Sequence, residues 1–158
     1  PTATYAARLS DSQDLLGVFQ LTDSQLLLLG VVSPEDGLYR TQLKYEPAVV
    51  VLQFPLQPGA TWTTTSQVSG VALGVMSVYT EKYESQVDAQ GDLKIPLGTF
   101  DVQRVRTLLT RTVGLMVTTT RTFTFTSECF GTVASITSES NETKEEFTQA
   151  AEIRRLSP

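Results

Sequence analysis

Residues 73 to 89 alternate in side-chain character with a period of two and form the longest such run in the chain. Alternate positions of this run would lie on one face of a strand: Val75, Ser77, Tyr79, Glu81, Tyr83, Ser85 and Val87. Such alternation is typical of a half-buried β-strand and is incompatible with the 3.6-residue period of a helix. A chain with this run at its centre is therefore expected to build a sheet.

Shorter stretches of the same kind fill the rest of the chain and are separated by turns rich in Gly, Pro, Asp and Ser. The further ranges expected as strands are 3–9, 15–21, 25–32, 38–45, 48–54, 61–69, 93–95, 99–110, 115–126 and 131–138. This pattern predicts an all-β fold, a single curled antiparallel meander (half-barrel or barrel-like) of about nine to eleven strands. A β-sandwich is the alternative that the pattern also accepts. Residues 1–158 are expected to form one all-β domain.

Three places decide how the predicted strands begin and end. Pro47 separates two of them, and Gln90-Gly91-Asp92 is expected to close a hairpin after residue 89. Pro96 cannot donate to a ladder, so the stretch Pro96 to Gly98 predicts a sharp corner. The last segment, 145–156, is either an edge strand or a helix, and its alternation favours the strand.

Composition excludes several chemistries. The chain has no histidine, which removes Ser-His and Cys-His nucleophilic systems, histidine metal ligands and the usual general base near neutral pH. The one cysteine, Cys129, cannot form an intrachain disulfide or an all-thiolate metal site. Glu128 beside it disfavours a thiolate, so Cys129 is expected to be buried and inert. No metal, cofactor or catalytic residue is predicted.

Charge and hydropathy limit the partners. The net charge of −5 argues against nucleic acid, whose backbone requires a surplus of Lys and Arg on one face. The longest apolar run, residues 26–32, is too short to cross a bilayer, so no transmembrane span is expected. The chain begins at Pro1 without a methionine, as a processed or trimmed chain would.

Three motifs follow one another along the chain: Phe54-Pro55-Leu56 with Pro58-Gly59-Ala60-Thr61-Trp62, then Ile95-Pro96-Leu97-Gly98-Thr99-Phe100, then Phe130-Gly131-Thr132-Val133. This ordered set resembles uncharacterised bacterial exported proteins and lipoproteins of the domain-of-unknown-function 3108 type, over about residues 50 to 138. The resemblance implies an extracytoplasmic bacterial protein, periplasmic or tethered to a membrane by a removed N-terminal segment, with a curved antiparallel sheet. It implies no catalytic residues.

Five aromatic residues are candidates for ligand binding: Trp62, Tyr79, Tyr83, Phe100 and Phe123. Trp62 follows a Pro-Gly turn and could offer its ring at a cavity mouth or fill the core. Tyr79 and Tyr83 share one predicted face, where they could flank a ligand or pack across strands. Phe100 and Phe123 belong to the strands expected to form the concave face.

These observations predict a non-catalytic domain that binds an apolar small molecule or lipid in the concave face of the sheet. The first alternative is a structural or interaction module of the cell envelope, which binds an envelope protein. The second is a hydrolase that uses two carboxylates, drawn from Glu81, Glu84, Asp88, Asp92, Asp101 and Glu128.

Overall fold

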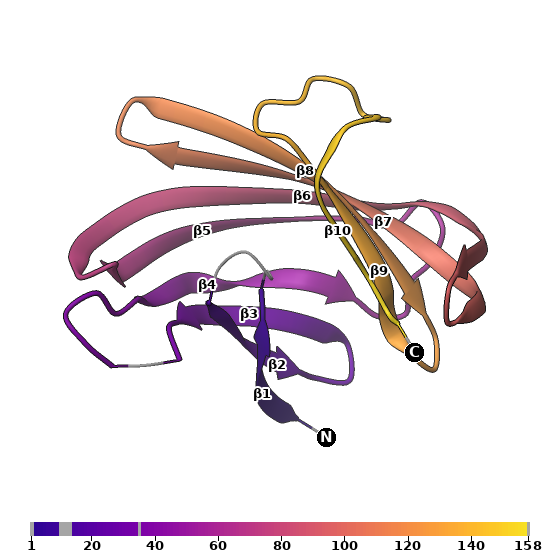
Figure 1. Ribbon diagram of the computed structural model, residues 1–158, viewed down its shortest axis with the longest axis horizontal. Coiled ribbons are helices and arrows are strands. Elements are labelled where there is room, and N and C mark those ends of the chain that lie inside the picture. Colours follow the sequence, from indigo (N-terminus) through magenta and orange to yellow (C-terminus); the bar gives the residue numbers. More distant parts are fainter. Residues whose placement is uncertain (1, 10–13, 35, 158) are drawn as a thin grey trace. The chain divides into compact units, whose positions relative to one another are not determined.

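The computed structural model describes residues 2–9, 14–34 and 36–157 of the chain. The described residues form ten strands and no helix (Figure 1). The strands are β1 (Ala3–Arg8), β2 (Leu16–Leu21), β3 (Gln25–Val32), β4 (Gln42–Gln53), β5 (Thr61–Ala72), β6 (Val75–Ile95), β7 (Gly98–Val113), β8 (Met116–Ser127), β9 (Gly131–Ser138) and β10 (Ala150–Arg155). The predicted all-β fold is confirmed.

All ten strands are hydrogen-bonded into one sheet in chain order, from β1 to β10. The pairs β1–β2, β2–β3, β3–β4, β4–β5, β8–β9 and β9–β10 are antiparallel. This order is that of a single antiparallel meander, as predicted, and the two separate sheets of a sandwich do not form. Because each connection reverses the chain, the β1–β2, β3–β4, β5–β6 and β7–β8 connections belong to the same end of their strands.

The chain divides into two compact units. Unit 1 comprises the described parts of Pro1–Pro55, with Thr64–Lys82 and Arg111–Met116. Unit 2 comprises Leu56–Thr63, Tyr83–Thr110 and the described part of Val117–Pro158. The long strands β5 to β8 contribute segments to both units.

Unit 1 buries the inward faces of β3, β4 and β5. In β5 every second residue from Thr64 to Val68 is buried, as the period of two requires. The buried side chains of this core are mostly branched aliphatic ones: Leu28, Val31, Leu43, Val49, Leu52 and Val68.

Strand β4 runs through Pro47, so the expectation of two strands separated at that residue was wrong. The proline removes one backbone donor, but hydroxyl groups of β5 replace the missing ladder bonds. Ser66 Oγ donates to the carbonyl oxygen of Pro47 at 2.7 Å, and Thr64 Oγ1 accepts from the backbone N–H of Val50 at 3.1 Å. These two side chains keep β4 and β5 together where regular pairing stops.

Strand β6 also runs further than predicted, because Gln90-Gly91-Asp92 lies inside it and closes no hairpin. Beyond this stretch, Leu93 and Ile95 pack against the buried cluster of Phe100, Val102 and Val133 in unit 2. Burying these two side chains requires the strand to continue, and the exposed Gly91 tolerates the extended conformation. The reversal comes at Pro96 and Leu97, so the predicted corner is the turn between β6 and β7.

The end of the chain differs in detail from the expectation. Strand β10 covers only Ala150–Arg155 of the segment 145–156, and it pairs with β9 as an edge strand of the sheet. Cys129 is exposed, so the prediction of a buried thiol was wrong. It lies in the three-residue turn between β8 and β9. This turn directly precedes Gly131, the first residue of β9, which has a φ of 69°.

In the part of the chain that the structure describes, no helix is long and apolar enough to span a membrane.

Gly70 in β5 provides a test of the fold of unit 1. Its φ is +139°, and a Cβ on it would collide with the backbone carbonyl oxygen of Gln42. We expect Gly70→Ala to lower the free energy of unfolding by about 2–4 kcal/mol, from backbone strain and overpacking. Gly37→Ala is the matched control, since nothing lies within 4 Å of its added Cβ. Urea titration measures both, and equal effects would contradict the close approach of β4 and β5.

Candidate functional site

A cavity of about 900 Å³ lies in unit 1. It is bounded by β3, β4, the end of β5, the start of β6 and the end of β7, together with the connection between β3 and β4. Most of its lining is aliphatic or aromatic, and the strand residues in it include Val31, Leu43, Tyr45, Tyr79 and Arg111. Besides Arg111, three charged residues line the cavity: Asp14, Asp36 and Arg40. Pockets that hold small molecules have this size and this mixture of many apolar groups with a few polar ones.

A fully buried carboxylate, that of Glu81, is bonded to the cavity-lining residue Arg111. Glu81 belongs to the inward face of β6, two residues after Tyr79, and its side chain has no exposed surface. It accepts a hydrogen bond from Nε of Arg111 at 2.7 Å. A buried carboxylate without a cation would be very costly, so the sequence can place Glu81 there only together with Arg111.

Arg111 reaches from this carboxylate to the cavity. Burial opposes its charge, but the attraction of Glu81 and the hydrogen bond to it raise the pKa of the guanidinium. The side chain is still 47% exposed, and its guanidinium carbon lies 5.2 Å from the centre of the Tyr79 ring. Among the described residues, only Nε of this guanidinium has a hydrogen-bond partner. The two terminal nitrogens of Arg111 are thus available as donors to a ligand in the cavity.

Tyr79 forms one wall beside this arginine. Burial is the main cause that raises the pKa of its phenol, and the negative charge of Glu81 adds to it. Arg111 and a hydrogen bond with Tyr45 act in the opposite direction without reversing the shift. At neutral pH the cavity therefore presents a neutral phenol and a cationic guanidinium side by side.

A second, smaller pocket of about 360 Å³ lies in unit 2. Aromatic and charged side chains line it together: Trp62, Glu84, Arg106, Arg121, Phe123 and Glu145. Trp62 and Phe123 are buried, and the Phe123 ring stacks on Phe147 with the ring centres 5.0 Å apart. The aromatic rings therefore belong mostly to the packing of this unit.

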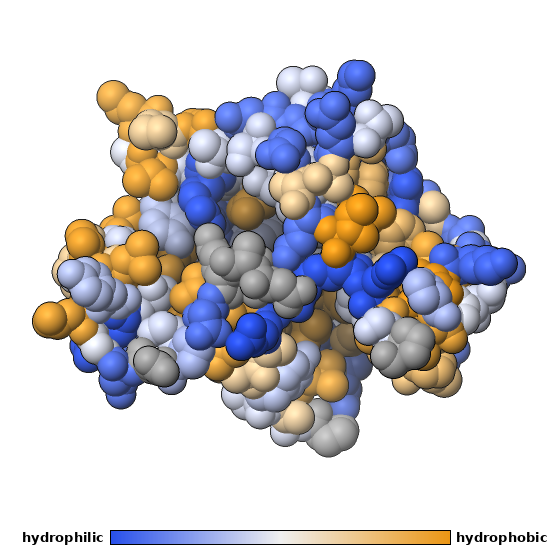
Figure 2. Space-filling view, viewed as in Figure 1, coloured by the Kyte–Doolittle hydropathy of each residue, from blue (hydrophilic) through white to orange (hydrophobic). Residues whose placement is uncertain are grey.

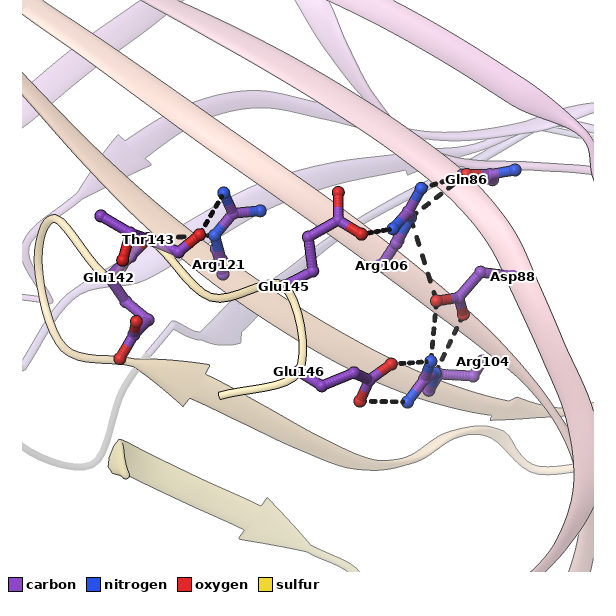
Figure 3. Close-up of polar contacts among 9 residues, drawn as sticks. All are labelled: Gln86, Asp88, Arg104, Arg106, Arg121, Glu142, Thr143, Glu145 and Glu146. Atoms are coloured by element: carbon purple, nitrogen blue, oxygen red, sulfur yellow. Dashed lines mark hydrogen bonds and ion pairs between the residues drawn. The ribbon is translucent and has the colours of Figure 1, made fainter. Parts of the chain in front are cut away.

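Three arginines of unit 2 hold the segment 139–149, which we name the strap (Figure 3). Arg104 donates to both carboxylate oxygens of Asp88, at 2.9 and 2.8 Å, and to both of Glu146, at 3.1 and 2.6 Å. These hydrogen bonds raise the pKa of Arg104 well above its usual range, and its guanidinium also lies 4.4 Å from the centre of the Phe123 ring.

The other two arginines of this network are similarly engaged (Figure 3). Arg106 donates to Gln86 Oε1 at 3.1 and 2.7 Å, and to Glu145 at 2.6 Å. Arg121 donates from Nε to the backbone carbonyl oxygen of Glu142 at 3.0 Å. The cations beside this pocket are bound to the protein's own acceptors, whereas Arg111 of unit 1 keeps two nitrogens available. The cavity of unit 1 is therefore the better candidate for a ligand site.

The five aromatic residues predicted from the sequence are distributed over the two units. Tyr79 lines the cavity of unit 1, and Trp62 and Phe123 line the pocket of unit 2. Phe100 is part of the packed cluster with Val102 and Val133, and its ring meets the edge of Phe130 at 5.0 Å. Tyr83 is partly buried in unit 2 and lines neither of these two pockets.

The sequence prediction missed the residues that give the cavity its polar character. Arg111 was not singled out. Glu81 was considered as the acid between Tyr79 and Tyr83 on one strand face and as one of a pool of possible catalytic carboxylates. The period of two did place Tyr79 and Glu81 on the same inward face, which could have pointed to a buried carboxylate in need of a cation. The identity of that cation depends on which residue of β7 lies opposite β6.

Among the described residues, no group of three or more acidic or cysteine side chains is arranged to hold a metal ion. Comparisons with protein-family models, with curated proteins and with solved structures found no match for this chain. The resemblance to the domain-of-unknown-function 3108 type therefore stays a prediction.

The pairing of Glu81 with Arg111 can be tested by a double-mutant cycle. We expect Arg111→Met to lower the free energy of unfolding by about 2–4 kcal/mol, because it removes the cation beside a buried carboxylate. This loss lies below the full range for buried ion pairs because the Arg111 side chain is partly exposed to solvent.

The double variant Glu81→Met with Arg111→Met serves as the control, since it removes both charges and keeps apolar volume. Its stability should return to within about 1 kcal/mol of the starting protein, as measured by urea unfolding. A double variant as unstable as Arg111→Met alone would contradict the assignment of the cost to the unpaired carboxylate.

Tyr79 gives a test at alkaline pH. Its pKa is raised in the folded state, so the neutral phenol contributes stability below the unfolded-state pKa of about 10. That contribution is lost as the pH rises through the folded-state pKa. We expect ultraviolet difference titration against Tyr79→Phe to show one phenol that ionises above an ordinary tyrosine, and the alkaline loss of stability to be smaller in the variant. A difference spectrum centred at about 10 would contradict the burial of this phenol.

Proposed function

We propose that the chain is a non-catalytic binding domain that holds an apolar or lipid-like small molecule in the cavity of unit 1. The observation that carries the proposal is a cavity of about 900 Å³ lined mainly by aliphatic and aromatic side chains. Burial of an alkyl chain or ring system there would contribute roughly 25 cal/mol for each Å² of apolar surface removed from water.

The polar end of the ligand is defined by Arg111. Its terminal nitrogens have no hydrogen-bond partner among the described residues, and its Nε is fixed by the buried Glu81. A guanidinium oriented in this way favours a group with two acceptor oxygens, such as a carboxylate or a phosphate. The ligand class that fits best is an amphiphile with one oxygen-rich end.

The proposal includes an extracytoplasmic location in a bacterium, as an exported protein or a lipoprotein tethered by its N-terminal side. Its support is the resemblance of the motifs around Trp62, Pro96 and Gly131 to exported bacterial proteins. A carrier of apolar molecules is also useful in an aqueous compartment between membranes, where such molecules do not diffuse freely.

Binding of a dansyl-labelled medium-chain fatty acid tests the proposed function. Ala72 lines the cavity and is only partly buried, so Ala72→Trp should fill part of the cavity without overpacking the core. We expect this variant to weaken binding by about tenfold or more. Ala89→Trp is the matched control, because Ala89 is exposed and lines neither pocket.

Fluorescence titration gives the dissociation constants, and thermal unfolding checks that both variants fold. The methyl ester of the same probe should bind more weakly than the acid if Arg111 receives the carboxylate. Absence of saturable binding by the starting protein, or equal loss of binding in the two tryptophan variants, would overturn the proposal.

A further inference from the structure

Three connections at one end of unit 1 expose large apolar side chains. They are residues 36–41 of the β3–β4 connection, the β5–β6 turn and the β7–β8 turn, and hydrophobic residues gather over them at the left of the space-filling view (Figure 2). We name their six most exposed large side chains the apolar rim: Leu38, Tyr39, Leu73, Met76, Leu115 and Met116. Leu38 is 89% exposed and Leu115 is completely exposed. Monomeric soluble proteins rarely expose so many large apolar side chains close together unless these side chains contact a partner.

Two of these connections are fixed to each other. The backbone N–H of Gly74 donates to the carbonyl oxygen of Arg40 at 3.0 Å, and the N–H of Leu73 donates to Thr41 Oγ1 at 3.2 Å. A side chain at Gly74 would collide with the carbonyl oxygen of Leu38, so the two backbones approach as closely as glycine permits. These hydrogen bonds therefore fix this part of the rim in the unbound protein.

The β5–β6 turn carries a leucine where the backbone disfavours it. Leu73 has a φ of 49°, a left-handed conformation that glycine and asparagine adopt readily and bulky side chains do not. Two-residue hairpin turns of this kind usually have Asn or Gly at that position. Leucine at this site reduces the stability of the turn and adds an exposed apolar side chain. A contact made by that side chain would explain its presence.

Charge is absent from the sequence around both turns. No charged residue occurs between Gln67 and Glu81 or between Arg111 and Arg121. Arg40, beside Tyr39, is exposed, and among the described residues its guanidinium has no hydrogen-bond or ion-pair partner. The third connection is charged, because the exposed side chains of Asp36 and Arg40 lie on either side of Leu38 and Tyr39 in the sequence. Two uncharged apolar turns beside a connection that carries a cation match the order of a lipid monolayer, with acyl chains below the phosphate groups.

We propose that the apolar rim inserts into the surface of a phospholipid bilayer, with Arg40 at the level of the lipid phosphates. The rim consists of side chains on separate narrow turns, which a fluid acyl layer can surround individually. Protein interfaces are usually centred on Trp, Tyr and Arg, and the rim has one aromatic residue. With a net charge of −5 the chain would gain little from electrostatic attraction to anionic lipids, so the apolar side chains must supply the binding.

This inference does not depend on the ligand of the cavity. Leu38, Tyr39 and Leu73 belong to the rim and also line the cavity, so a bilayer contacted by the rim would lie at the cavity's edge. A lipid-derived ligand could then pass between them without crossing bulk water.

Flotation with vesicles of phosphatidylcholine tests the proposal. We expect the full chain to float with the vesicles and the variants Leu73→Asn and Leu115→Asn to lose about tenfold or more in partition coefficient. Asparagine suits the left-handed conformation at position 73, so Leu73→Asn should unfold at the same or a higher temperature than the starting protein. The control is Leu21→Asn, an exposed leucine of unit 1 that lies outside the rim.

Three results would overturn the proposal: no flotation of the starting protein, flotation of both rim variants at the starting level, or equal loss in Leu21→Asn. Sedimentation without lipid distinguishes a second copy of the chain as the occupant. A dimer that Leu73→Asn dissociates, in a protein that does not float, would assign the rim to self-association. Binding of the dansyl-labelled fatty acid is measured separately on Leu115→Asn, because Leu115 belongs to the rim and does not line the cavity. A failure of the cavity and a failure of the rim therefore give different results.

Discussion

The contact between Glu81 and Arg111 determines what unit 1 can do. A carboxylate with no exposed surface is tolerated because a guanidinium lies at 2.7 Å, and this fixes the opposite residues of β6 and β7 at that point. The same contact directs the arginine along the Tyr79 ring toward the cavity. Two apolar residues in place of the pair are expected to leave the stability nearly unchanged, and we infer that the pair contributes more to the relative position of β6 and β7 than to stability.

Much of the fold could be predicted from the alternation of side chains, since it depends only on the sequence of one strand at a time. Strands β3 and β9 have the predicted bounds, and the meander order was also correct. The predicted strand boundaries were wrong where contacts with neighbouring strands outweigh the local preference of a proline or glycine. Pro47 was expected to end a strand, but hydroxyl groups of β5 hold it in place. Gly91 was expected in a turn, but burial of Leu93 and Ile95 keeps the strand extended.

The candidate site was only partly accessible from the sequence. The inward position of Tyr79 follows from parity within β6, and so does that of Glu81. The pairing of Arg111 with Glu81 does not follow from the sequence of one strand. Arg111 comes thirty residues after Glu81, and the register between β6 and β7 decides whether the two side chains meet. Cys129 was expected to be buried, but it lies in the β8–β9 turn, where its side chain is exposed.

The strap of unit 2 differs in kind from the strands around it. Its ion pairs link it to β7, and the acids that it contributes, Glu145 and Glu146, are 65% and 70% exposed. Exposed pairs of this kind weaken as ionic strength rises, while backbone pairing between β9 and β10 does not. Higher ionic strength is therefore expected to weaken the attachment of the strap to β7, while the stacking of Phe147 on Phe123 and the pairing of β9 with β10 stay in place.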